Sequence, residues 1–465
     1  MPRLRVPKSL RKAALDGLAA YFADYVDQLC VKRALSDVRQ AIVLIKEYTH
    51  PCLPPRLYNE VCRKFLAKFL WIQRNRNKTH PASHNRAALE VLMDLDIVGL
   101  QCVGEIMKYF DPADAGRFRR LSVLKLHHVW NHIGPKSLEN FDLRNLIELH
   151  VTFLCVDRDL EVVGANCPKL LVLHIEESRR VTDNGLKALR PCSELRVLCV
   201  AGCQVTDTGI NELLSTNKKI IEFNIGRHAI YSAEESFDVL SRPRSLVCPF
   251  MKRFSIKCHS ITDEHLHAIV ELFPNLTYLR INGEIKGDLC TLKRLDKLIV
   301  LNFIVSRYNY QLPMDNMNEL LTSIGKNITM LNLKQLTQAD LNFICKVCVN
   351  IEHLTFHYPK YSPPRPMVVP SFRKLKMFEC IIHPEYTGDS RILEFSTMPE
   401  LRHLRCYDEV LSRGEFMESL ELILFDHKRF PNLKTVFASG INAEICERMN
   451  QAAKQKNINF FIQPY

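Results

Sequence analysis

A repeat of about 25 residues constrains this chain more than any other feature of its sequence. Residues 169–193 read KLLVLHIEESRRVTDNGLKALRPCS, and residues 194–217 read ELRVLCVAGCQVTDTGINELLSTN. Leu170 and Leu173 in the first segment match Leu195 and Leu198 in the second, at an offset of 25 residues. Self-similarity at a fixed period of this size indicates a stack of structural repeats, because a single repeat cannot bury its apolar face alone.

An apolar template, L-x-x-L-x-L, recurs near this period over most of the chain. Within each repeat, the alternating run predicts a short strand, and the apolar spacing that follows, as in 185–189 and 265–269, predicts an outer helix. The thirteen starting positions are Leu121, Leu146, Leu170, Leu195, Ile220, Met251, Leu276, Leu298, Ile328, Ile351, Leu375, Leu401 and Leu433. The core that we expect between strands and helices includes Leu173, Leu198, Phe254 and Leu279.

Threonine–aspartate pairs stand before several of the expected helices, at Thr182–Asp183, Thr206–Asp207 and Thr262–Asp263. Their side-chain oxygens predict helix caps. Together with Cys167 and Cys203, these features resemble the cysteine-containing leucine-rich repeats of F-box receptors, over roughly residues 118–460. The resemblance implies an α/β leucine-rich-repeat solenoid, a horseshoe with a parallel sheet and outer helices. A proline-rich loop at Tyr358–Pro370 is expected in place of one helix.

Residues 1–117 lack the repeat and predict an α-helical N-terminal domain, followed by a solenoid of about thirteen units over 118–465. Helical apolar spacing runs through 9–25, 31–48, 56–71 and 87–110, and a polar linker lies near 74–85. This part is basic: residues 1–120 carry 21 Lys/Arg and 12 Asp/Glu, a net +9 of the chain's +12. A soluble helical surface explains the charge best, because no aromatic–basic interleaving accompanies it. Nucleic-acid binding is the alternative, and a steep salt dependence of binding would identify it.

Two segments of the N-terminal domain resemble docking motifs of cullin-type ubiquitin-ligase receptors. Leu10, Ala14 and Leu18 resemble the BC-box that engages elongin B and C, although Cys is commoner than Ala at the middle place. The second segment resembles the cullin box, through Leu53, Pro54, Leu57 and Val61. The resemblance implies helices that insert apolar side chains into a partner's groove. A degenerate F-box over 53–66 and a helical cap that only shields the first repeat are the alternatives.

The concave strand face is the expected partner-binding surface, because side chains alternate along a strand and the flanking positions are not needed for the core. Arginine and tyrosine on such a face are typical anchors for a protein partner. His150 and His174 occupy equivalent places in adjacent repeats, so we expect them about 4.8 Å apart. The predicted face residues are His150, His174, Arg253, Lys257, Tyr278, Arg280, Arg405 and Tyr407.

The sequence shows no constellation typical of an enzyme or a metalloprotein. Cys345 and Cys348 have half of a zinc-like spacing without a second pair, so a buried thiol pair on a helix explains them better. We therefore expect no catalytic residue, no cofactor and no metal. The 17 cysteines are scattered without a disulfide framework, and neither a signal peptide nor an apolar run of about 18 residues is present, which favours the cytoplasm or nucleus and no membrane partner.

The sequence predicts a non-enzymatic substrate receptor of a cullin-type ubiquitin ligase, which holds a protein on its concave face. The alternative is a general interaction scaffold that has no ligase partner.

Overall fold

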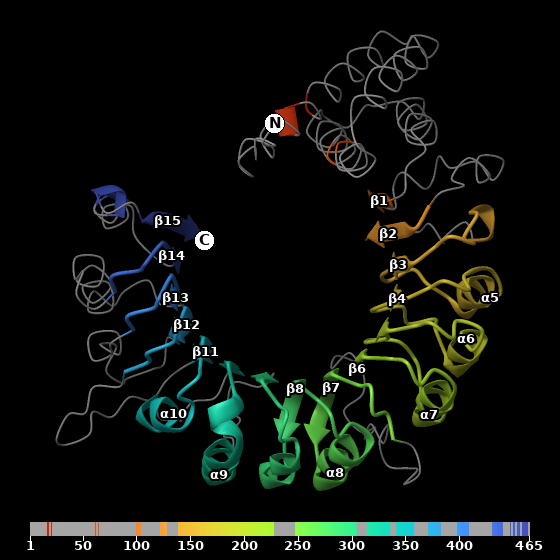
Figure 1. The fold of residues 1–465 in the computed structure, drawn as a ribbon. Coiled ribbons are helices and arrows are strands. Elements are labelled where there is room, and N and C mark those ends of the chain that lie inside the picture. Colours follow the sequence, from red (N-terminus) through yellow and green to blue (C-terminus); the bar gives the residue numbers. More distant parts are fainter. Residues whose placement is uncertain are drawn as a thin grey trace, which may run out of the picture. The chain divides into compact units, whose positions relative to one another are not determined.

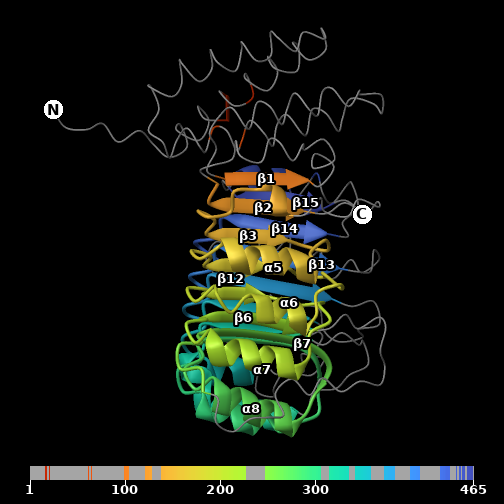
Figure 2. The ribbon, with the colours of Figure 1, turned by 90° about the vertical axis from the view of Figure 1, so that its right-hand side faces the viewer.

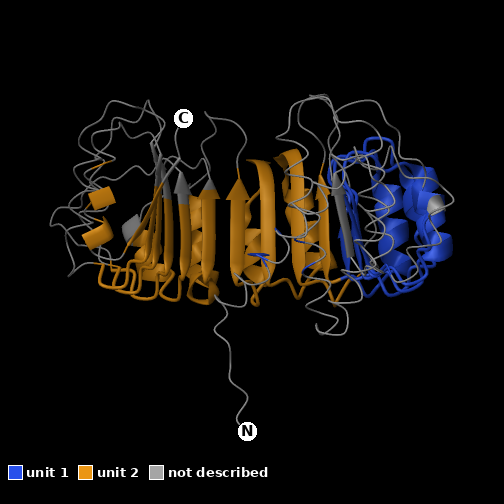
Figure 3. Cartoon of the chain, turned by 90° about the horizontal axis from the view of Figure 1, so that it is seen from above, with its two compact units in different colours: residues 1–220 blue, residues 221–465 orange. Residues whose placement is uncertain are grey.

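The computed structural model describes residues 99–103, 121–127, 138–226, 247–304, 314–334, 341–357, 371–382, 398–408, 430–439 and 458–463, with single positions in 16–64 and 447–455. The chain divides into two compact units, residues 1–220 (unit 1) and 221–465 (unit 2), which Figure 3 colours separately. None of the helices in the described part is both long and apolar enough to cross a lipid bilayer.

Unit 1 contains parallel strands that pair in chain order, and the helices α5, α6 and α7 lie on one side of them (Figures 1 and 2). The helices α5, α6 and α7 stack in the same order as the strands (Figure 2). The strands are β1 (Gly99–Val103), β2 (Val123–His127), β3 (Glu148–Val151), β4 (Val172–His174) and β5 (Val197–Cys199). Among the described residues, the complete helices of this unit are the 3-10 helix η3 (Leu138–Asn140), α5 (Asp157–Asn166), α6 (Asp183–Ala188) and α7 (Asp207–Thr216).

Unit 2 repeats this plan, and each of its described strand pairs is parallel. Its strands are β6 (Glu222–Gly226), β7 (Arg253–Ile261), β8 (Tyr278–Ile285), β9 (Val300–Ile304), β10 (Met330–Lys334), β11 (His353–His357), β12 (Met377–Ile382), β13 (His403–Asp408), β14 (Thr435–Ser439) and β15 (Asn459–Gln463). The helices described in full in this unit are α8 (Asp263–Leu272), η4 (Leu289–Arg294), α9 (Met314–Ile324), η5 (Gly325–Asn327) and α10 (Leu341–Val347).

The α/β leucine-rich-repeat solenoid predicted from the period is confirmed. A strand begins two residues after each of the thirteen predicted starting positions, from β2 after Leu121 to β14 after Leu433. The predicted core residues Leu173, Leu198, Phe254 and Leu279 are each 0% exposed. The template therefore fixed both the strand positions and the side of each strand that packs against the helices.

Two strands were not predicted. We expected a helix over 87–110, and this was wrong for Gly99–Val103, which forms β1 and pairs with β2 in register Gly99↔Val123. A short apolar run fits the period of either element, and here the pairing with β2 decides in favour of the strand. The repeat sheet thus begins before the boundary at 117/118 that we predicted. At the other end, Asn459–Gln463 adds β15 beside β14. The expected loop at Tyr358–Pro370 lies outside the described residues.

Aspartates at the starts of α5 and α6 link each of these repeats to the next one. Asp157 accepts hydrogen bonds from the backbone N–H of Thr182 at 2.7 Å and from its hydroxyl at 2.6 Å. Asp183 accepts the same pair of bonds from Thr206, with the N–H at 2.7 Å. Thr182 also caps its own helix, because its hydroxyl accepts from the N–H of Asn184 at 3.3 Å. The cap prediction is thus confirmed for Thr182, whereas the Thr206 side chain makes no cap hydrogen bond to its own helix. Asp183 and Asp263 bond to the neighbouring repeat instead.

The glycines that follow Thr182–Asp183 and Thr206–Asp207, Gly185 and Gly209, make room for these bonds between repeats. A Cβ atom on Gly185 would lie 2.5 Å from Oδ1 of Asp157, and one on Gly209 would lie 2.2 Å from Oδ1 of Asp183. Both distances are shorter than a side chain tolerates. The repeated V-T-D-x-G pattern therefore records a contact between repeats as well as a helix start.

Candidate functional site

The described helices lie on one face of the strands, and the opposite face, named the open face here, is covered by none of these helices (Figure 1). In β3 the helix-side residues Leu149 and Val151 are buried, whereas Glu148 and His150 on the open face are partly exposed. Parallel pairing in register aligns such positions into rows across successive strands. The open face is the candidate functional site of each unit.

In unit 1, one row runs through Lys125, His150, His174 and Cys199 on four successive strands. The imidazole rings of His150 and His174 are stacked, with centroids 4.3 Å apart and planes 3° from parallel. The prediction that the two histidines are neighbours is confirmed.

Glu148 lies beside this row and receives two hydrogen-bond donors. Nε2 of His150 lies 2.6 Å from its Oε1, and the Lys125 ammonium group donates to the same oxygen. Burial disfavours ionisation of Glu148, but the hydrogen bonds with Lys125 and His150 outweigh it and lower the pKa of the carboxyl group. Burial, the facing His174 and the charge of Lys125 lower the pKa of His150, against the opposing hydrogen bond with Glu148. Glu148 is thus a carboxylate next to a predominantly neutral imidazole.

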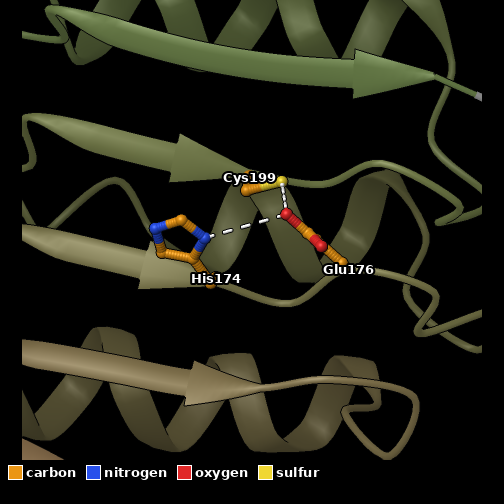
Figure 4. Close-up of side chains that lie close together, drawn as sticks. All are labelled: His174, Glu176 and Cys199. Atoms are coloured by element: carbon orange, nitrogen blue, oxygen red, sulfur yellow. Dashed lines mark hydrogen bonds and ion pairs between the residues drawn. The ribbon is translucent and has the colours of Figure 1, made fainter. Parts of the chain in front are cut away.

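A second group forms where β4 and β5 end (Figure 4). Oε1 of Glu176 lies 3.8 Å from Nδ1 of His174 and accepts a hydrogen bond from the Cys199 thiol, with 2.7 Å between sulfur and oxygen. The contact with His174 lowers the pKa of Glu176, although partial burial opposes it. Burial raises the pKa of the Cys199 thiol, and the neighbouring carboxylate raises it further. Nitrogen, oxygen and sulfur donors thus converge at the open face of unit 1.

In unit 2 the open face carries arginines that contact aromatic rings. The Arg253 guanidinium lies 4.2 Å from the ring centroid of Tyr278, and its Nε is 3.1 Å from Oε2 of Glu222. Further along, the Arg405 guanidinium lies 5.1 Å from the ring centroid of Phe437 and 3.7 Å from the Glu379 carboxylate. Arginine held between a carboxylate and an aromatic ring is oriented in advance, so little side-chain entropy is lost on binding.

Beyond Arg405 the aromatic surface continues onto the last two strands. The rings of Phe437 and Phe461 are stacked, with centroids 4.8 Å apart, and Phe461 is 48% exposed. An exposed apolar ring beside arginine is typical of a protein-binding surface.

Several shielded polar atoms between these two ends have no hydrogen-bond partner among the described residues. They are Oδ1 of Asn302, Oδ1 of Asn332, Nδ1 of His353 and Nε of Arg405. Asn302 and Asn332 are direct neighbours in register, and His353 follows on the next strand. A shielded polar atom that makes no hydrogen bond costs about 1–3 kcal/mol. Because these atoms are shielded from solvent, a partner that docks on the open face would not contact them directly.

The other predicted site residues lie on the open face of unit 2 or in the N-terminal region. Arg280 in β8 and Lys257 in β7 lie on the open face of unit 2 and are partly exposed, whereas Tyr407 lies in β13 with a side chain outside the described part. In the N-terminal region Val61 is helical and only 3% exposed, so it packs within the protein. The remaining predicted docking residues, Leu10, Ala14, Leu18, Leu53, Pro54 and Leu57, lie outside the described residues.

Sequence reasoning missed six residues of the open faces: Cys199, Glu222, Asn332, Glu379, Phe437 and Phe461. The register of the template would have found the first five, because each occupies an outward position of a predicted strand. Phe461 belongs to β15, which the template does not reach. The register between predicted strands would therefore have identified most of these residues from the sequence.

No protein-family model matches the chain, and no curated protein matches it in sequence. Among solved structures it is similar to the yeast Rad7–Elc1 complex, with TM-score 0.45 and 11% identity over 93% of this chain and 97% of that one. It is also similar to the Toll–Spatzle complex of Drosophila, with TM-score 0.38 and 13% identity over 77% of this chain and 52% of that one. A leucine-rich-repeat protein of Leptospira interrogans gives TM-score 0.36 and 12% identity over 83% and 93%.

Proposed function

We propose that this chain is a non-enzymatic receptor that binds a protein partner on the open face of unit 2. The observation that carries the proposal is the pair of partly exposed arginines that lie over aromatic rings on this face, Arg253 over Tyr278 and Arg405 over Phe437. Arginine and aromatic side chains are the residue types that dominate protein interfaces.

The partner would supply groups that bind the exposed side chains of this face. The Arg253 and Arg405 guanidinium groups are partly exposed, so a segment with carboxylate and backbone carbonyl groups fits them. The exposed ring of Phe461, stacked on Phe437, adds apolar area at the Arg405 end of this face. A polypeptide offers both kinds of group, which favours a protein over a small apolar ligand.

Binding is tested with the full-length chain. The chain is used to capture proteins from cells, the leading protein is purified, and its Kd is measured for wild type and variants. Tyr278→Ala with Arg280→Ala should weaken binding roughly 30-fold, the size of an interface hot spot. The matched control is His267→Ala with Glu271→Ala, on the exposed side of α8, which should leave the Kd unchanged. Equal loss in both double variants, or none in the first, would refute this surface.

We further propose that the N-terminal segment docks a ubiquitin-ligase scaffold, so that the bound protein is a ligase substrate. The support is the resemblance of Leu10, Ala14 and Leu18 to a BC-box and of Leu53, Pro54 and Leu57 to a cullin box. The Lys64 side chain forms an ion pair with Asp16, so the two box-bearing segments contact each other. An interaction scaffold without a ligase partner is the alternative, and the buried Val61 favours it for that one residue.

Co-purification decides between the two. Leu10→Ser with Leu18→Ser should remove elongin B and C, whereas Leu53→Ala with Pro54→Ala should remove only the cullin. A matched control, Lys187→Ala on α6, should retain both. If wild type captures neither elongin nor a cullin, the scaffold function replaces the receptor function.

A further inference from the structure

The end of β4 and the end of β5 bring together three side chains with metal-binding atoms. Nδ1 of His174, a carboxylate oxygen of Glu176 and Sγ of Cys199 all lie within 4.8 Å of one another (Figure 4). The register places Cys199 directly beside His174, and Glu176 follows His174 by two residues. We propose that His174, Glu176 and Cys199 form a binding site for a zinc-like divalent transition metal on the open face of unit 1.

The donor set selects the class of metal. One imidazole, one carboxylate and one thiolate are all accepted by Zn²⁺, whereas Mg²⁺ and Ca²⁺ prefer oxygen donors alone. With zinc distances of about 2.0–2.3 Å and tetrahedral angles, the donor atoms should lie about 3.4–3.6 Å apart. The His174 Nδ1 to Glu176 Oε1 distance of 3.8 Å is close to that value.

The distance between Sγ of Cys199 and Oε1 of Glu176 must increase when a metal ion binds. At 2.7 Å the Cys199 thiol proton lies between sulfur and the Glu176 carboxylate. A metal ion would take the place of this proton, and the two atoms would separate by about 0.9 Å to reach tetrahedral spacing. The Glu176 side chain is 41% exposed, so it can rotate by this amount without disturbing the core.

The surroundings hold the imidazole in place. The His174 ring stacks on His150, which in turn contacts Glu148, and Glu148 accepts from Lys125. The stacked and hydrogen-bonded His150 ring therefore limits rotation of the His174 imidazole. Below the site, Leu198 and Val200 are buried, so the metal would have an apolar floor. Three protein ligands leave a fourth position open on the solvent side, where water or a partner's side chain completes the coordination.

The site requires no bound protein partner, so it is tested on the full-length chain alone. Anaerobic titration with Co²⁺, a spectroscopic substitute for Zn²⁺, should give one saturable equivalent with a sulfur-to-cobalt charge-transfer band. Zn²⁺ should bleach that band, and competition with a chromophoric chelator gives the Zn²⁺ affinity. Cys199→Ser should abolish the band.

Controls are needed because the chain has 17 cysteines. Cys203→Ser removes a buried thiol of the same repeat, whose Sγ donates to the Ile175 carbonyl at 3.2 Å, and it should keep the band. His174→Gln keeps every thiol and should lower the Zn²⁺ affinity at least about 10-fold, and it serves if Cys199→Ser does not fold. A wild-type chain without saturable one-equivalent binding, or a band that persists in Cys199→Ser, would overturn the site and leave these side chains a hydrogen-bonded group only.

Discussion

The open faces of the two units differ although the same repeat builds both. In unit 1 the outward side chains satisfy one another, from Lys125 through Glu148 and His150 to the group around Glu176. In unit 2 the arginines are oriented by aromatic rings, and shielded polar atoms such as Oδ1 of Asn302 lack a partner among the described residues. The backbone plan alone therefore does not decide what an open face does.

The difference teaches which positions carry function in such a repeat. Inward positions are apolar in both units, because every repeat needs the same core. Outward positions are released from packing, so their chemistry can change from one unit to the next without altering the fold. A self-satisfied network favours a small cation that enters between existing donors, whereas a face of partly exposed arginines and aromatic rings favours a partner with many groups.

The largest expected effect tests the shared core. Leu198→Ala in unit 1 and Leu279→Ala in unit 2 should each lower the free energy of unfolding by about 2–5 kcal/mol, because each removes fully buried methyl groups and leaves a cavity. Urea denaturation gives the size, and hydrogen exchange read by mass spectrometry shows which unit is weakened. Ile299→Ala, at a residue 41% exposed, is the matched control. A cost in only one of the units would break the premise that they share one plan.

The inward half of each strand was predictable, and the open faces were only partly so. The template gave Leu173 and Phe254 as core because apolar periodicity is set by burial, which every repeat shares. It missed β1, because a short apolar run fits a helix as well as a strand. Only the pairing with β2 in the structure shows that this segment is a strand. The contact between His150 and His174 followed from register, but Cys199 was overlooked, because a cysteine between apolar neighbours resembles core until the register places it beside His174.

A smaller loss of stability is expected when the aspartates at the helix starts are removed, and it differs between the two units. Asp183 accepts two hydrogen bonds from Thr206 in unit 1, whereas Asp263 in unit 2 accepts from the backbone N–H of Asp288 at 2.6 Å. Asp183→Ala should cost about 1–2 kcal/mol of unfolding free energy and Asp263→Ala about 1 kcal/mol, measured by urea denaturation. Asn184→Ala, an exposed neighbour, is the control for Asp183→Ala. An equal or reversed order would show that the hydroxyl bond of Thr206 adds nothing to the bonds between repeats.

The smallest expected effect concerns pH and the unsatisfied face of unit 2. Burial lowers the pKa of His353, the facing Lys376 and His403 add to this, and Glu352 opposes it. Because the folded pKa lies below that of the unfolded chain, the unfolded chain binds more protons near pH 6, and stability is lost as the pH falls below about 6.5. Tm measured from pH 7.5 to 5.5 should therefore fall less in His353→Gln than in wild type. His267→Gln, which removes an exposed imidazole of α8, is the matched control and should follow wild type. Identical curves for wild type and His353→Gln would mean that the shielded Nδ1 gains an acceptor when His353 is protonated, and the open face of unit 2 would then resemble that of unit 1.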